Sequence, residues 1–259
     1  MRHTFQTMGT VASIELPQDW TSEVAALERI FSLIDERFSL HRPESELSKL
    51  ATGRLVLPSA SAELLASYAR ALTWRNETAG LFSPHRPDGT IDLNGIVKAE
   101  AIEQAGEYLT SVGCPQWSIN VGGDILVSPT GAATAVTSSA GQLAPPLLRA
   151  GIADPAAPTQ LLCSLELRHR RRAIATSGSA QRGDHIWRGG SFEPAEFVQV
   201  SVVANDIVTA DVLATTIVAG GRAALDDVAD RWDVDVITVD RAGDLRATPG
   251  LVSALASAS

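Results

Sequence analysis

The sequence predicts an α+β protein in which helices pack on mixed or antiparallel sheets. Segments with apolar residues three and four positions apart are interspersed with many short segments in which apolar and polar residues alternate. No GxGxxG follows a predicted strand and no GxxxxGK[ST] loop is present, which argues against a doubly wound nucleotide-binding fold. With 259 residues, 45% of them hydrophobic, the chain can form one large domain or two intimately associated lobes. No internal repeat or linker divides it, so we expect residues 1–259 to form a single domain.

The N-terminal part of the chain contains one predicted strand and two predicted helices. The segment 11–16 has strand character and ends before Pro17. Apolar residues then recur at helical spacing over 24–38, where Asp19 or Thr21 can cap the helix. The polar stretch 38–50 fits either a loop or the start of a helix. A second apolar face predicts a helix at 60–75, which ends before Gly80.

The C-terminal part combines further strands with helices. Period-two alternation predicts strands at 163–167, 173–178, 198–202 and 236–239, and the last turn leads to a short strand near Leu245. Helical spacing predicts helices at 207–219, with Asp206 as a capping residue, and at 222–229. The interval 128–150 is rich in Ala, Ser, Thr and Pro, which favours edge strands and loops.

Composition excludes several classes of partner. A formal net charge of −9 argues against a general nucleic-acid binder and against electrostatic attachment to anionic lipid. No run of eighteen apolar residues is present and the N-terminal residues do not resemble a signal peptide, so we expect a cytoplasmic protein without membrane insertion. Cys114 and Cys163 belong to no CxxC pair, which favours two reduced, buried thiols over a zinc site or a disulfide.

The stretch from Asp92 to Val127 carries the first indication of a binding site. Asp92, Asn94 and Gly95 form a polar turn ahead of Ile102, Ala105, Leu109 and Val112, which share one helical face. The amides and dipole at such a helix start favour an anion, and Lys98 adds a positive charge. A phosphate group is the natural ligand. The alternative is that Lys98, one of only two lysines in the chain, is simply exposed.

A glycine pair follows the strand that comes next. Trp117, Ile119 and Val121 alternate with polar residues, and the strand runs into Gly122-Gly123-Asp124. Two glycines allow the backbone to approach a ligand closely, but a tight bend explains them equally well. Both readings stay open at this point.

Two oxygen-bearing side chains lie on one face of an otherwise apolar helix. Asp211 and Thr215 are four residues apart, which places a carboxylate above a hydroxyl. Oxygen donors of this kind suggest a magnesium site completed by substrate phosphates. The alternative is a buried hydrogen bond between the two side chains. The basic run 168–172 favours a solvated hairpin turn over a phosphate clamp.

An ordered set of motifs resembles one known family, the ApbE family of FAD:protein FMN transferases. The matching blocks are MGT at Met8, FSxxRPxSELSxL from Phe38, LFSP at Leu81, DLNGIVK at Asp92, NVGGDI at Asn120, GIADP at Gly151, ATSG at Ala175, HI at His185 and ADVLATT at Ala210. They span nearly the whole chain. The resemblance implies an ApbE-like fold with a flavin cleft and magnesium-dependent transfer of the FMN part of FAD to a threonine or serine hydroxyl of an acceptor protein, with release of AMP.

The resemblance also implies roles for individual residues. Asp211, Thr215 and the backbone carbonyl of Gly95 would hold Mg²⁺, and we expect Gly95 to lie in a loop. Asp92 and Lys98 would bind FAD. The residues that would line the flavin and adenine pockets are Met8, His41, Leu81, Phe82, Ser83 and Ile186. His185 would be the general base, because histidine titrates near physiological pH.

The chain departs from the family pattern at a few of these positions. An aromatic residue is usual where His41 stands, and aspartate is common where Ser83 stands. The family usually follows its HI block with an IDPxTG loop, whereas here residues 187–190 intervene.

Two other functions compete with the transferase. An FAD pyrophosphatase would use the same metal site with water in place of the acceptor hydroxyl, giving FMN and AMP. A non-catalytic FAD-binding protein would lack the base. The chain carries no convincing flavin acceptor motif, since the nearest match is Thr130-Gly131-Ala132-Ala133-Thr134. The acceptor is therefore expected to be another protein.

Overall fold

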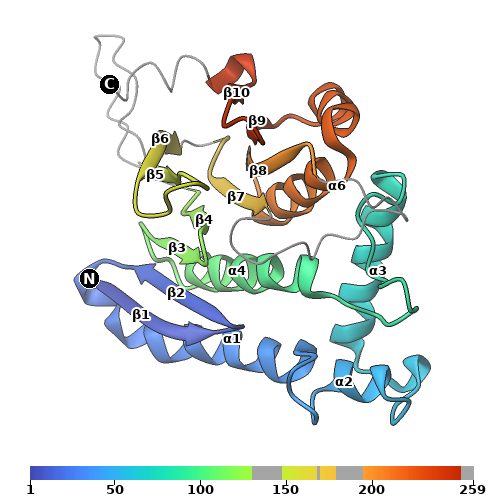
Figure 1. The fold of residues 1–259 in the computed structure, drawn as a ribbon. Coiled ribbons are helices and arrows are strands. Elements are labelled where there is room, and N and C mark those ends of the chain that lie inside the picture. The colour runs from blue at the N-terminus through green and yellow to red at the C-terminus, as the bar shows by residue number, and fades with distance from the viewer. Residues whose placement is uncertain (130–147, 168–169, 179–194, 252–259) are drawn as a thin grey trace.

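A computed structural model describes residues 1–129, 148–167, 170–178 and 195–251. It has one large antiparallel sheet with helices on one face and a small two-stranded sheet on the other (Figure 1). The prediction of an α+β fold with packed helices and antiparallel sheets is confirmed.

The large sheet has eight strands, and every neighbouring pair is antiparallel. In spatial order they are β1 (Arg2–Thr7), β2 (Thr10–Glu15), β3 (Ser118–Val121), β4 (Asp124–Val127), β7 (Ala173–Gly178), β8 (Phe197–Ala204), β9 (Asp235–Asp240) and β10 (Leu245–Ala247). The small sheet pairs β5 (Leu148–Ala153) with β6 (Leu161–Leu167). Apart from β1, β4 and β5, which were not predicted as strands, these strands match the predicted ones closely.

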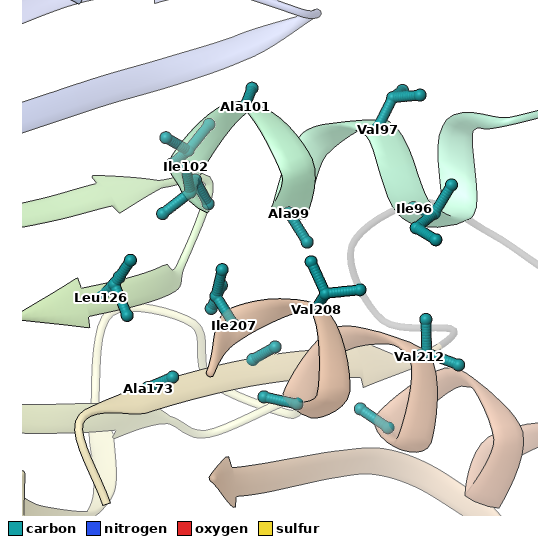
Figure 2. Packing of buried hydrophobic residues seen from close by; sticks show 14 of the residues in the cluster. Ile96, Val97, Ala99, Ala101, Ile102, Leu126, Ala173, Ile207, Val208 and Val212 are labelled. Atoms are coloured by element: carbon teal, nitrogen blue, oxygen red, sulfur yellow. The ribbon is translucent and has the colours of Figure 1, made fainter. Parts of the chain in front are cut away.

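The helices gather around a central α4. They are α1 (Val24–Phe38), α2 (Glu46–Ala51), α3 (Ala62–Glu77), α4 (Asn94–Ser111) and α6 (Ile207–Arg231), with 3-10 turns at Gln18–Glu23 and Leu57–Ser59. Figure 1 shows α4 crossing the middle of the molecule between α1 and α6. Apolar side chains join α4 to α6, and Figure 2 shows Ala99 facing Val208 across that contact. Two helices from distant parts of the sequence therefore lie side by side over the sheet.

Period-two alternation explains how β7 is buried on both faces. Ala173 and Ala175 join the core beneath the helices, whereas Ile174 joins a second core under β5 and β6. The strand ends in half-buried Ser177 and Gly178. These two residues are held in place by a fully packed strand.

The N-terminal hairpin was not predicted. Strands β1 and β2 pair from Arg2–Glu15 to Thr7–Thr10, and the turn between them consists of Met8 and Gly9 with φ angles of 48° and 72°. Two left-handed residues suit a tight hairpin, but the usual sequence signal for it is Asn-Gly or Asp-Gly. A methionine in this conformation is uncommon, which is why the turn was missed.

The two helices predicted at 207–219 and 222–229 are confirmed. They form the two parts of α6, which meet at a kink at Gly221, whose φ of 63° is not helical. Asp206 caps α6 as expected, since its side chain accepts a hydrogen bond of 2.8 Å from the Thr209 amide. In the part of the chain that the structure describes, α6 is the one helix long and apolar enough to cross a membrane, and 67% of that apolar window is buried inside the protein.

Some smaller expectations differ from the structure. The α1 helix begins at Val24 without a side-chain cap, so neither Asp19 nor Thr21 has that role. Val112 follows α4 and is 40% exposed rather than inward-facing. Cys114 is buried as expected, but Cys163 is only half-buried, and burial raises the pKa of both thiols.

Glu100 makes stability depend on pH. It is 6% exposed on α4, and its Oε2 accepts a hydrogen bond of 2.7 Å from the Ser67 hydroxyl. Burial raises the pKa of this carboxyl. The folded protein therefore holds the proton more tightly than the unfolded chain. As the pH rises above the ordinary carboxyl pKa, the free energy of unfolding falls until the raised pKa is passed.

We expect Glu100→Gln to stabilise the protein at pH 8 and to lose that advantage below about pH 4. Glutamine keeps an acceptor for Ser67 and has no charge to bury, and Arg70 retains its ion pair with Glu103. The expected gain is about 1 kcal/mol, or roughly 2–4 °C in Tm. Thermal denaturation of both proteins from pH 4 to pH 8 measures it. A difference in Tm that does not change with pH contradicts this assignment.

Candidate active site

One cavity of about 1040 Å³ lies where the β1–β2 turn, the ends of α1 and β7, the start of α4 and one side of α6 meet. Its volume is at the upper end of the roughly 300–1,000 Å³ that ligand pockets span, so it has room for a dinucleotide. Its lining includes the predicted site residues Met8, His41, Leu81, Phe82, Ser83, Asp92, Gly95, Lys98, Asp211 and Thr215. These residues come from segments far apart in the sequence. The predicted base His185 and the predicted pocket residue Ile186 lie outside the described residues.

The lining has an exposed rim and a buried floor. His41, Leu81 and Ser83 are exposed, whereas Phe82 and Asp211 are buried, at 4% and 5%. An aromatic or apolar group can therefore enter past a mixed rim and reach charged side chains at depth.

Asp92 fixes the start of α4. Its Oδ1 accepts a hydrogen bond of 3.0 Å from the Asn94 amide, and its Oδ2 accepts one of 2.7 Å from Nε of Arg86. Nη2 of Arg86 lies 2.7 Å from the same Oδ2 in an ion pair. Sequence reasoning did not single out Arg86, which also lines the cavity. Its guanidinium is thus locked to the end of the helix where the dipole favours negative charge.

The expectation that Gly95 lies in a loop is wrong. The helix begins at Asn94, so Gly95 is in its first turn. A Cβ at this position would stand 3.0 Å from Cε2 of Phe82, and glycine therefore allows the phenyl ring to pack against the helix start. A helical carbonyl accepts one hydrogen bond within the helix but has a second lone pair, so Gly95 can still offer an oxygen atom to a cation.

Lys98 is not the exposed lysine of the alternative reading. Its side chain is 12% exposed and forms an ion pair with Asp124, whose side chain is 1% exposed. The Asp124 Oδ1 also accepts a hydrogen bond of 3.1 Å from the Thr176 amide on β7. Asp124 therefore ties the lysine of α4 to two strands. Sequence reasoning noticed Asp124 in the Gly-Gly-Asp run but gave it no partner.

The two readings of the glycine pair are compatible. Gly122 and Gly123 form the tight β3–β4 bend with φ angles of 61° and 99°. Gly122 also lines the cavity, and a Cβ there would stand 2.8 Å from Oγ1 of Thr10. The bend thus brings backbone to the cavity wall and delivers Asp124 to Lys98.

Asp211 and Thr215 lie on the side of α6 that faces the cavity. The Thr215 hydroxyl has Ser177 as its hydrogen-bond partner among the described residues, with 3.0 Å between the oxygens. Together with the Gly95 carbonyl, these residues offer a carboxylate, a hydroxyl and a carbonyl oxygen. This set fits Mg²⁺, which prefers hard oxygen donors and usually keeps positions for water and substrate phosphates. Among the described residues, no three His, Cys, Asp or Glu side chains gather as a metal-binding group.

Further polar pairs line the cavity without having been predicted. Arg42 donates from Nε to Asp35 at 2.7 Å, and His85 shares a hydrogen bond of 3.0 Å with the Tyr68 hydroxyl. The sequence signal was that Arg42 lies inside the block that begins at Phe38 and that His85 directly follows the LFSP block at Leu81. Their partners could not be read from the sequence, because they come from neighbouring helices.

The basic run has structural partners. Arg171 pairs with Asp233 and Asp235, each at 2.6 Å, and the Arg172 guanidinium lies 5.9 Å from the ring centroid of Trp117. Neither residue lines the cavity. The described part of the run therefore does not form a phosphate clamp at this cavity. The prediction of a hairpin turn is also wrong, because the flanking strands β6 and β7 belong to different sheets. Arg168 and His169 lie outside the described residues.

Gly178→Ala should damage the cavity and lower stability. The φ angle of Gly178 is ordinary, but an added Cβ would stand 2.3 Å from the backbone oxygen of Val198 on the neighbouring strand. Gly178 and Val198 both line the cavity. We expect a loss of about 1–3 kcal/mol, since backbone must move to relieve the clash. Thermal denaturation and FAD titration of the variant measure both effects.

A matched control is Gly151→Ala on β5. There the added Cβ would meet only the side chain of Leu161, at 2.9 Å, and that side chain is 66% exposed and can rotate away. We expect this variant to match the wild type within about 0.5 kcal/mol. Equal effects of the two substitutions contradict the role given to the β7–β8 contact.

Comparison with known proteins identifies relatives of the whole fold. The sequence profile of the ApbE family matches residues 84–238, which is more than half of the chain. No curated protein sequence matches the chain significantly.

Solved structures are similar over nearly the full length. Flavin Transferase ApbE from Vibrio cholerae is 20% identical, with a TM-score of 0.72 over 96% of each chain. The ApbE protein from Thermotoga maritima is 17% identical, with a TM-score of 0.75 over 98% of this chain and 99% of that one. Flavinyl transferase ApbE from Pseudomonas stutzeri, in its apo form, is 15% identical, with a TM-score of 0.73 over 98% and 97%. At these identities the likeness establishes the fold.

Proposed function

The chain belongs to the ApbE family, and from this premise we propose that it transfers the FMN part of FAD to a threonine or serine hydroxyl of an acceptor protein and releases AMP. The observation that carries the proposal is the convergence of ten residues, chosen from the sequence, on one cavity of about 1040 Å³. Similar structures named as flavin transferases support it. We also propose that residues 1–259 act as one domain, because those structures match at least 96% of the chain.

The proposed reaction is an attack by a hydroxyl on a pyrophosphate. The acceptor oxygen forms a bond to the phosphorus of the FMN half, and the bond from that phosphorus to the bridging oxygen breaks. AMP leaves with the bonding electrons, and the hydroxyl proton passes to a base. The base remains the predicted His185, outside the described residues.

The described residues can bind and orient the FAD. Lys98, held by Asp124, keeps a positive charge in the cavity wall beside the start of α4. A fixed cation and helix amides stabilise the charge that builds up on the phosphates as the bond breaks. Met8 and Leu81, together with the buried ring of Phe82, offer apolar surface to the flavin rings.

The proposed metal is Mg²⁺, held by Asp211, Thr215 and the carbonyl of Gly95. When bound, it supplies a positive charge that offsets the charge on the pyrophosphate oxygens. The protein contributes the rigidity of α4 and α6, which set the spacing of these three oxygens.

One assay separates the transferase from its two competitors. Purified protein is incubated with FAD and Mg²⁺, with and without an acceptor protein that carries a threonine in a small-residue motif. Acceptor-dependent covalent flavin fluorescence with AMP release supports transfer. Release of AMP and FMN without labelling indicates an FAD pyrophosphatase, and bound FAD with neither product indicates a binding protein. Either of the last two outcomes overturns the proposal.

A further inference from the structure

Two neighbouring threonines on α6 use their hydroxyls differently. Thr216 donates to the carbonyl of Val212 at 2.8 Å, four residues earlier. This bond within the helix is a common arrangement for a helical threonine. Thr215 instead shares a hydrogen bond of 3.0 Å with the hydroxyl of Ser177 at the end of β7. A residue outside the helix therefore sets the orientation of the Thr215 hydroxyl.

Ser177 is well placed for this task. It belongs to a strand that is packed on both faces, and it lines the same cavity as Thr215 and Asp211. The Thr215 hydroxyl is its hydrogen-bond partner within the described residues. The sequence marked this strand only as one that ends in small hydroxyl residues.

We propose that Ser177 is a positioning residue that orients the Thr215 hydroxyl toward the metal. The inference rests on the metal site of the proposed function. A hydroxyl has one proton and two lone pairs. If Ser177 accepts the proton of Thr215, a lone pair of Thr215 is left for the cation. Binding to a cation makes that hydroxyl a stronger donor, which strengthens its bond to Ser177.

Loss of the serine hydroxyl frees Thr215 to rotate. Its nearest alternative acceptor is the carbonyl of Asp211, four residues earlier, by the same bond that Thr216 makes to Val212. That rotation turns the oxygen away from the direction that Ser177 defines. The metal then loses an oriented ligand although no ligand has been replaced.

The test measures metal affinity directly. Mn²⁺, which has a signal in electron paramagnetic resonance, is titrated into the full chain with FAD bound and no acceptor. We expect Ser177→Ala to raise the Kd for Mn²⁺ about tenfold, in line with the loss of a residue that orients a metal ligand. Ser177→Thr, which restores a hydroxyl, should return the Kd to within about threefold of the wild type. The affinity for FAD without metal should be unchanged in both variants.

A double variant tests whether the effect passes through Thr215. In a Thr215→Ala background, Ser177→Ala should produce no further loss of Mn²⁺ affinity, because coupled residues are not additive. Ser201→Ala is the control, since it removes a buried hydroxyl on β8 whose partner, at 2.8 Å, is Thr176. Its Kd for Mn²⁺ should equal that of the wild type.

The outcomes separate this inference from the proposed function. If Thr215→Ala weakens Mn²⁺ binding but Ser177→Ala does not, or if the two effects add, the positioning role is wrong while the metal site stands. If Thr215→Ala leaves the Kd unchanged, both the metal site and the role of Ser177 are wrong.

Discussion

Asp211→Asn is expected to lower metal-dependent turnover about 10²–10³-fold, the effect of removing one preorganised charge stabiliser from an active site. The carboxylate lies on α6 facing the cavity and is 5% exposed. Asparagine has nearly the same shape but carries no charge. It therefore removes the strongest of the three proposed metal ligands and leaves the packing of the helix intact.

Two measurements check this expectation. Turnover of FAD is followed by AMP release, and the Mg²⁺-dependent rise in Tm of the FAD-loaded protein is followed by thermal denaturation. Both should be lost in Asp211→Asn. The control is Asp226→Asn, which removes an exposed carboxylate from the same helix. Undiminished turnover in Asp211→Asn, or an equal loss in the control, contradicts the site assignment.

Lys98→Met is expected to destabilise the protein by about 3–5 kcal/mol and to abolish FAD binding. It removes one partner of a buried ion pair and leaves the Asp124 carboxylate without that cation in a position where its side chain is 1% exposed. Breaking such a pair costs far more than its net contribution to stability, because an uncompensated charge stays buried. At roughly 2–4 °C per kcal/mol, the loss in Tm is on the order of 10 °C.

A second substitution separates stability from binding. Lys98→Met/Asp124→Asn removes both charges, and asparagine keeps an oxygen for the Thr176 amide. We expect it to regain most of the lost stability but not the affinity for FAD, since the cavity still lacks its lysine. FAD is titrated by quenching of flavin fluorescence. Full FAD affinity in the stable double variant would show that Lys98 serves the fold alone.

Local patterns were enough to predict the frame of the molecule. The apolar face of α4 and the long apolar run of α6 follow from helical spacing, and β7 and β8 follow from short alternating segments. The position of Asp211 and Thr215 on one side of α6 followed from their spacing of four residues. These features depend on residues close together in the sequence, where periodicity is informative.

The rest depended on contacts between distant segments. The partner of Lys98 could not be predicted, because it requires α4 to pack against β4. The hydrogen bond between Ser177 and Thr215 likewise joins a strand to a helix that is distant in the sequence. The prediction of a loop at Gly95 was wrong because a glycine is common in loops. In the structure Gly95 lies in the first turn of α4, where the absence of a side chain leaves room for the ring of Phe82.

The most direct test is a crystal structure of the protein with FAD and Mg²⁺ in the absence of an acceptor. We expect the pyrophosphate to lie between Lys98 on α4 and Asp211 on α6, with the metal in contact with the Asp211 and Thr215 oxygens. The flavin rings should lie against Met8 and Phe82. FAD bound outside this cavity, or a metal that contacts neither α6 residue, would contradict the proposed site.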